Sequence, residues 1–138
     1  MKLELERIEE PFVFKVENEA GWSCQIDASE AIGGKQKGMR PMELLAASLA
    51  GCASIDITRI LTKKRIPTSQ FSISIEAKRS DSLPSPFEWI ILNIHLDETI
   101  DQEVVKQVVE LTLNKYCSVA ASLKKSITIR YTINDKSL

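Results

Sequence analysis

Cys52 and Cys117 are the two residues of this chain best suited to chemistry. Cys52 lies in a long apolar stretch that is typical of a buried helix, and Cys117 ends a later amphipathic stretch. Two helical thiols in a chain with three cysteines indicate redox chemistry more than a disulfide framework. A buried cysteine can equally be a small core residue, so both interpretations stay open on the residues alone. The third, Cys24, lies in a strand-like stretch, where we expect it to fill a strand face.

A cysteine that acts as a nucleophile must ionise, and burial in an apolar helix raises the pKa of a thiol. Asp56 and Arg59 follow Cys52 by four and seven residues, which places them on its side of a helix. Arg59 would stabilise a Cys52 thiolate, whereas Asp56 would oppose it unless the two charges pair. Cys117 precedes a helix expected at 118–123 with Ser118 as its cap, and a helix N-terminus favours a thiolate.

Other chemically capable residues point to structure instead. His95 is the only histidine, and it alternates with apolar residues of a predicted strand, so we expect a surface or interface side chain. A metal site built from Cys52, Cys117 and His95 lacks the local ligand spacing of zinc motifs, and we expect none. The Gly-rich segment 32–38 is expected to be a mobile basic loop, and it lacks the phosphate-binding GxxxxGK[ST] pattern.

The composition is that of an ordinary globular domain. The 138 residues fit one domain, 1–138, and hydrophobic and charged residues make up 43% and 27%. A net charge of −1 gives no reason to expect nucleic acid or anionic membranes as partners. The first residues do not form a signal peptide, and the apolar run 42–53 is too short to span a bilayer. A cytoplasmic location follows as the default expectation.

Hydrophobic periodicity predicts the elements that must position the two thiols. Alternating apolar residues predict short strands near 3–8, 12–16 and 22–26, and later strands at 71–77, 87–97 and 127–133. Pro41 opens a helix that runs to about residue 64, apolar on nearly every side. A second helix starts near 99–101, where Thr99 and Gln102 have capping-box spacing. The predicted order is β-β-β-α-β-β-α-α-β.

Two segments carry a family resemblance: Pro41 to Cys52 (PMELLAASLAGC) and Lys115 to Val119 (KYCSV). They resemble the cysteine motifs of the OsmC/Ohr family, the osmotically inducible and organic hydroperoxide resistance proteins, and the element order extends the resemblance over nearly the whole chain. The resemblance implies an α+β OsmC-like fold, with curved antiparallel sheets around two central helices in an intertwined homodimer. Such a dimer agrees with a helix that is apolar all round.

The resemblance also implies a reaction, a thiol-dependent reduction of organic hydroperoxides in oxidative or osmotic stress defence. Cys52 would attack the peroxide and become a sulfenic acid, and Cys117 would condense with it to a disulfide. A dithiol reductant, lipoyl-linked in the best-known members, would reset the pair. No metal or organic cofactor is implied.

One position departs from the family pattern. The peroxidases carry a glutamate directly after the helix-opening proline, where it holds an arginine near the reactive thiol. This chain has Met42 there, Glu43 one residue later, and Arg40 just before the helix. Arg40, Glu43, Asp56 and Arg59 are therefore the candidate thiolate or pocket partners. The departure keeps open a second hypothesis, a non-catalytic dimer that binds a small apolar or acyl ligand near Cys52.

Overall fold

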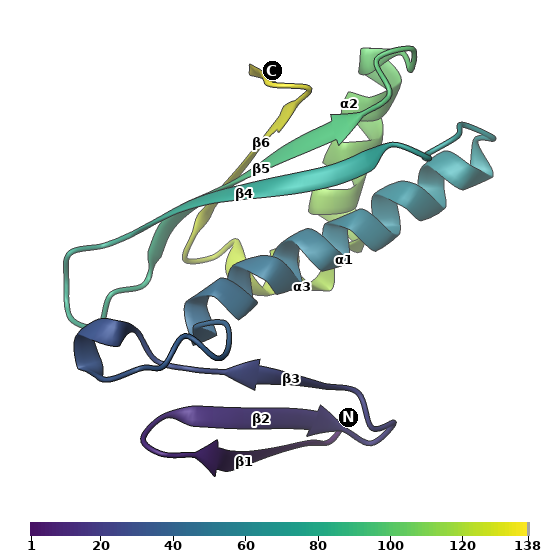
Figure 1. Ribbon diagram of the computed structural model, residues 1–138. Helices are drawn as coiled ribbons and strands as arrows, with labels where there is room; N and C mark the ends of the chain where they lie inside the picture. The colour runs from purple at the N-terminus through teal and green to yellow at the C-terminus, as the bar shows by residue number, and fades with distance from the viewer. Residues whose placement is uncertain (138) are drawn as a thin grey trace. The chain divides into compact units, whose positions relative to one another are not determined.

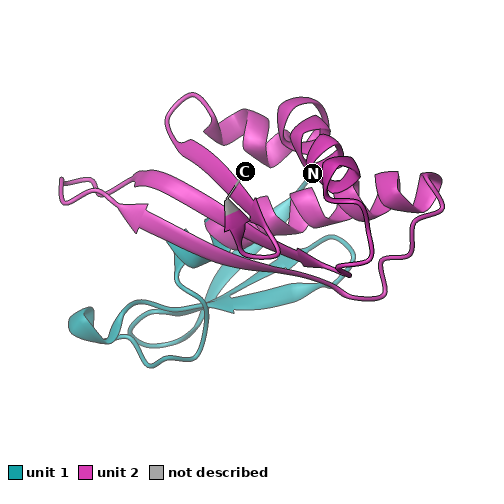
Figure 2. Cartoon of the chain, turned by 90° about the horizontal axis from the view of Figure 1, so that it is seen from above, with its two compact units in different colours: residues 1–45 teal, residues 46–138 magenta. Residues whose placement is uncertain are grey.

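The computed structural model describes residues 1–137, and its contacts separate the chain into two compact units, Met1–Leu45 and Ala46–Leu138 (Figure 2). The assignment of 1–138 to a single domain stays a prediction. The α+β class and the predicted order of the main strands and helices are confirmed. Short additional elements are a 3-10 turn, a π-helical turn and a C-terminal strand.

The first unit holds an antiparallel sheet of β1 (Leu3–Glu9), β2 (Val13–Asn18) and β3 (Ser23–Ile26), in that order (Figure 1). The register places Leu5, Val16 and Cys24 side by side on one face. Glu6 and Lys15 pair across the other face, at 3.5 Å. On the first face Leu5 and Cys24 are exposed and Val16 is half-buried.

A buried carboxylate organises the segment that was expected to be mobile. Asp27, only 2% exposed, accepts hydrogen bonds through Oδ2 from the backbone amides of Lys35 and Lys37, at 2.8 and 3.1 Å. The ammonium groups of the same two lysines pair with Glu9, at 2.7 and 2.6 Å. The lysines are therefore held at both ends, and the expectation of a loose basic loop is wrong.

The second unit holds a sheet of β4 (Phe71–Arg79), β5 (Phe87–Leu96), β6 (Thr128–Ile133) and β7 (Lys136–Ser137), in that order. The expected purely antiparallel arrangement is wrong for one pair, because β5 and β6 run parallel. The helices that connect these two strands carry the chain back to the starting end of β5, which is the crossover a parallel pair requires.

The core of this unit lies between one sheet face and the helices, which Figure 2 shows gathered on one side of the sheet. Alternate residues of β5 face that core and are at most 6% exposed, namely Ile90, Leu92, Ile94 and Leu96. Helix α1 (Pro41–Lys63) begins in the first unit and contributes to this core a stripe of fully buried residues, Leu49, Ala53, Ile57 and Leu61.

Helix α1 is not buried all round within one chain. Ile55 is 68% exposed. Gly51 is also exposed, and a β-carbon built there would have no neighbouring atom within 4 Å. By length and composition α1 could also cross a membrane, with a mean hydropathy of 1.5 in its most apolar window, but central helices of soluble proteins meet the same criterion. The shortness of the run 42–53 therefore does not decide whether α1 spans a membrane.

Two helices and a turn follow β5: α2 (Gln102–Leu111), a π-helical turn η2 (Thr112–Tyr116) and α3 (Ser118–Leu123). The predicted capping by Thr99 is wrong. Asp101 caps α2 by accepting the amide of Glu103 at 2.9 Å, and Thr99 bonds to Asp97 instead. The carboxylate at position 101 is closer to the first helical turn, so it reaches the free amide directly.

Candidate active site

Cys52 lies midway along α1, next to the buried stripe of that helix. Its side chain is half-buried, between fully buried Ala53 and exposed Gly51. The helix there continues without a break from Pro41 to Lys63, so the backbone at Cys52 is rigid. A half-buried thiol on a rigid helix can be reached by a reagent while its position stays fixed.

Cys117 lies where the π-helical turn ends and α3 begins. Its backbone is extended, with φ −69° and ψ 103°, and its amide donates to the carbonyl of Thr112 at 2.9 Å. The Cys117 side chain itself caps α3, since Sγ accepts the amide of Ala120 at 3.4 Å. The expected cap at Ser118 is therefore wrong by one residue. The chain leaves Cys117 only 2% exposed.

The structure brings the two thiols together. The Cys52 thiol lies close enough to Cys117 to act on its ionisation. Burial, followed by the proximity of Cys52, raises the pKa of the Cys117 thiol to about 11, although the Ala120 amide acts in the opposite direction. The expectation that the start of α3 favours a thiolate at Cys117 is thus overturned, because desolvation exceeds the effect of the amides. At neutral pH Cys117 is a protonated thiol beside the more accessible Cys52.

The acidic and basic residues that follow Cys52 do not form a pair. Asp56 is half-buried and Arg59 is exposed, and neither belongs to an ion pair among residues 1–137. Their placement on α1 agrees with the predicted spacing. An exposed guanidinium has only a weak, solvent-screened influence on a neighbouring thiol.

Arg40 and Glu43, in the first unit, bind each other at the start of α1. The Nε of Arg40 donates to Glu43 Oε1 at 2.8 Å, and the Arg40 amide donates to Glu43 Oε2 at 2.9 Å. The second bond is one half of a capping box. These bonds, the backbone one first, hold the pKa of Glu43 below its ordinary value. Arg40 and Glu43 therefore pair with each other, while Met42 occupies the family's glutamate position.

The remaining candidates lie outside this constellation. Cys24 is an exposed residue of β3, in the first unit. His95 lies on the half-exposed face of β5, with its Nε2 3.8 Å from Asp135. Residues 1–137 contain no group of three or more His, Cys, Asp or Glu side chains arranged to hold a metal ion.

Sequence reasoning missed two buried polar residues. Asp27 follows a strand and precedes a Gly-rich segment, which is a usual place for a turn-organising aspartate, so its role was open to prediction. Thr112 is fully buried, and its hydroxyl has no hydrogen-bond partner among the residues that the structure describes. In the sequence it occupies an apolar-face position of the amphipathic stretch that ends at Cys117, and nothing there distinguishes it.

The fold and the thiol pair define a class, that of α+β proteins with one cysteine on a long helix and a second, close to it in space, at the start of a later helix. The family model for OsmC-like proteins matches residues 34–132, which include both cysteines. The chain is 29% identical over 126 residues to Protein YhfA of Escherichia coli K12, covering 89% of this chain and 90% of YhfA. This chain belongs to the OsmC-like family.

Solved structures agree with this membership. A hypothetical protein from Aquifex aeolicus is 29% identical, with a TM-score of 0.79 and coverage of 96% of this chain and 94% of that one. An organic hydroperoxide resistance protein OsmC from Legionella pneumophila has a TM-score of 0.73 over 96% of both chains. At 16% identity, the Legionella protein shares the fold alone.

Proposed function

We propose that this protein is a thiol-dependent reductase of organic hydroperoxides, with Cys52 as the nucleophile and Cys117 as the resolving thiol. The observation that carries the proposal is the proximity of these two thiols in a chain of the OsmC-like family. Their unequal environments support the division of roles. Cys52 is half-buried and accessible, whereas Cys117 is 2% exposed with a pKa of about 11.

The proposed reaction has three balanced steps. The Cys52 thiolate attacks the peroxide, so that an S–O bond forms, the O–O bond breaks, and the alkoxide takes a proton and leaves as an alcohol. The Cys117 sulfur then displaces the hydroxyl of the Cys52 sulfenic acid, which leaves as water with the Cys117 proton. An external dithiol reduces the resulting disulfide by exchange. Because the thiolate is the attacking form, Cys117 must give up its proton as it attacks, and the departing hydroxyl takes that proton and leaves as water.

In this proposal Arg40 and Arg59 are the two candidate cations for the Cys52 thiolate. Arg40 pairs with Glu43, and Arg59 lies on α1 seven residues after Cys52. A homodimer belongs to the same proposal, because one chain leaves apolar residues of α1 exposed. We also propose that the reductant is a lipoyl-linked dithiol and that the protein acts in the cytoplasm.

The test is consumption of cumene hydroperoxide by the pure protein with a dithiol reductant, measured beside Cys52→Ser, Cys117→Ser and Cys24→Ser variants. We expect turnover to be lost in Cys52→Ser. In Cys117→Ser a sulfenic acid should accumulate, because the resolving step is missing. The Cys24→Ser control should keep wild-type turnover. Wild-type protein no faster than Cys52→Ser, with monothiol, dithiol and lipoyl reductants all tried, would refute the peroxidase.

A second candidate is a non-catalytic dimer that binds a small apolar or acyl ligand near Cys52. Met42 in place of the family's glutamate favours it, because a peroxidase gains nothing from a thioether there. Mass spectrometry of the purified protein under native conditions would detect a retained ligand. Retention that is equal in wild type and Cys52→Ser, without peroxide turnover, would support this second function.

A further inference from the structure

Thr112 is an anomaly beside the candidate site. It is fully buried, and its Oγ1 has no hydrogen-bond partner within residues 1–137. A buried hydroxyl without a partner costs free energy, so each such group in a native protein calls for an explanation. Three other hydroxyl side chains in the helices donate to the carbonyl four residues earlier, at 2.8, 2.7 and 2.9 Å, namely Ser54, Thr58 and Ser122.

The position of Thr112 connects it with Cys117. Thr112 opens the π-helical turn η2, and its carbonyl accepts the Cys117 amide at 2.9 Å, an i→i+5 bond. One residue therefore carries both the acceptor that holds Cys117 and an unused hydroxyl. Single π-helical turns occur often at functional sites, because they place a residue where a regular helix would not.

An exposed side chain of the same turn also has a hydrogen-bond partner. Lys124, just beyond α3, donates through Nζ to the side chain of Asn114 in η2 at 2.6 Å. This bond connects the segments on either side of Cys117. A disulfide requires the two sulfurs to approach to about 2 Å, so Cys117 must shift from its hydrogen-bonded position. The shift acts directly on Thr112, because its carbonyl accepts the Cys117 amide.

We propose that Thr112 is a positioning residue for the Cys52–Cys117 disulfide: its hydroxyl, unpartnered in the dithiol form, gains a hydrogen bond when Cys117 moves to bond Cys52. The hydroxyl then favours the disulfide over the dithiol. The inference deepens the proposed function and rests on its thiol pair. In the resolving step the S–S bond forms, the Cys52 S–O bond breaks, and the Cys117 proton leaves in water; Thr112 neither gains nor loses a bond to these atoms.

The test is the dithiol–disulfide equilibrium of Thr112→Val, measured in mixtures of reduced and oxidised dithiothreitol on a Cys24→Ser background. One hydrogen bond predicts a shift towards the dithiol of about fivefold, which for a two-electron couple raises the reduction potential by about 20 mV. Valine resembles threonine in shape and lacks the unpartnered hydroxyl, so the dithiol form should be at least as stable as wild type. Thr112→Ser should restore the equilibrium, which a purely steric role would not do.

A matched control is Thr58→Val, because that hydroxyl is already bonded to the carbonyl of Ser54. It should leave the equilibrium unchanged. An unchanged equilibrium in Thr112→Val, or a serine variant as defective as the valine variant, overturns the inference. If Thr112→Val does not fold, the dithiol–disulfide equilibria of Thr112→Ala and Thr112→Ser compare a side chain without a hydroxyl with one that has it. The readout does not use peroxide, so a failure here with intact peroxide turnover refutes the role of Thr112 alone.

Discussion

At the scale of single residues, the two thiols differ because their surroundings differ. Cys117 is nearly inaccessible and caps α3, whereas Cys52 is half-buried on a regular helix. Burial keeps the Cys117 proton in place, and the amide of Ala120 does not compensate. The residue that resolves the sulfenic acid in the proposed reaction is therefore the one that holds a proton at neutral pH.

The first residue-scale prediction concerns the order of alkylation by iodoacetamide. In reduced native protein at pH 8, Cys24 and Cys52 should be modified first and Cys117 last, because only thiolates react and Cys117 is buried. In Cys52→Ser the pKa of Cys117 should fall but stay above 9, because burial is the larger cause of its rise. Peptide mass spectrometry at successive pH values measures this. Modification of Cys117 as fast as Cys52 would contradict the assigned environments.

The raised pKa of Cys117 also makes the stability of the protein depend on pH. A thiol whose pKa is raised from 9.0 to about 11 stabilises the fold below pH 9, and this contribution is lost as the pH rises towards 11. We expect the urea midpoint of the reduced protein to fall over that interval more than that of Cys117→Ser. Equal slopes in the two proteins would show that Cys117 ionises normally.

At the scale of elements, the 27–38 segment is shaped by one carboxylate and by tight backbone contacts. Asp27 receives the amides of Lys35 and Lys37, and these bonds hold its pKa below the ordinary value. Gly34 lies so close to the strand end that a β-carbon there would approach the carbonyl oxygen of Ala28 to 2.0 Å. The segment leads directly into the Arg40–Glu43 pair, so its order determines how that pair is presented.

We accordingly predict that Gly34→Ala lowers the free energy of unfolding by about 1–3 kcal/mol, the usual effect of overpacking against backbone. Hydrogen exchange of the Lys35 and Lys37 amides should accelerate in parallel. Ser29→Ala is the control in the same segment, because the Ser29 side chain makes no capping bond, and its effect should stay within about 0.5 kcal/mol. Protected Lys35 and Lys37 amides in Gly34→Ala would mean that the close approach is not needed.

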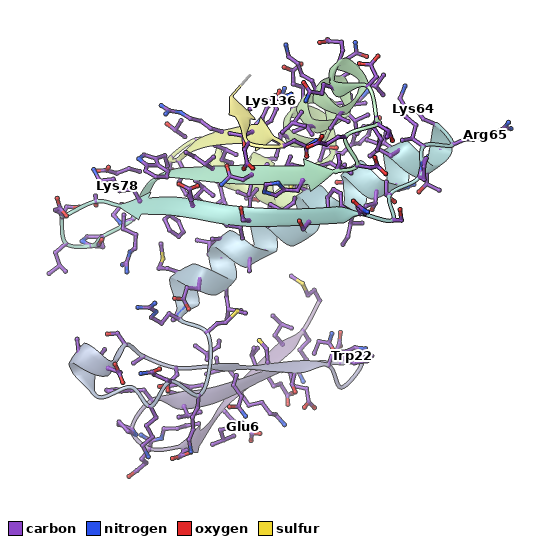
Figure 3. All side chains as sticks on the ribbon, turned by 45° about the horizontal axis from the view of Figure 1, so that its top comes forward. Glu6, Trp22, Lys64, Arg65, Lys78 and Lys136 are labelled. Atoms are coloured by element: carbon purple, nitrogen blue, oxygen red, sulfur yellow. The ribbon has the colours of Figure 1, made fainter. Side chains whose placement is uncertain are left out.

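At the scale of the whole molecule, each unit leaves apolar surface uncovered. In the first unit Leu3, Leu5 and Trp22 are 58%, 58% and 79% exposed; Trp22 lies at the turn before β3 (Figure 3). In the second unit the exposed side of α1 carries Ile55. Soluble chains seldom leave such patches open, so this surface fits the homodimer that belongs to the proposed function.

The corresponding prediction is that Ile55→Lys weakens self-association. A lysine there would bury an unpaired charge in a dimer but cost little in a monomer, where residue 55 faces solvent. Sedimentation equilibrium should give twice the chain mass of 15.5 kDa for the wild type and a lower average for the variant. Lys64→Glu, at an exposed position just beyond α1, should behave as wild type. A wild type that sediments as a monomer would contradict the dimer.

The sequence by itself determined the α+β class, the element order and the long helix from Pro41, because hydrophobic periodicity, prolines and caps act locally. It also identified Cys52 and Cys117 as the pair to examine. Only the tertiary structure decided that these thiols lie close together, that Cys117 caps α3 and keeps its proton, and that β6 runs parallel to β5. It alone revealed the pairing of Arg40 with Glu43 and the unpartnered hydroxyl of Thr112 within the described chain. Desolvation and partner geometry depend on residues distant along the chain, and no local pattern records them.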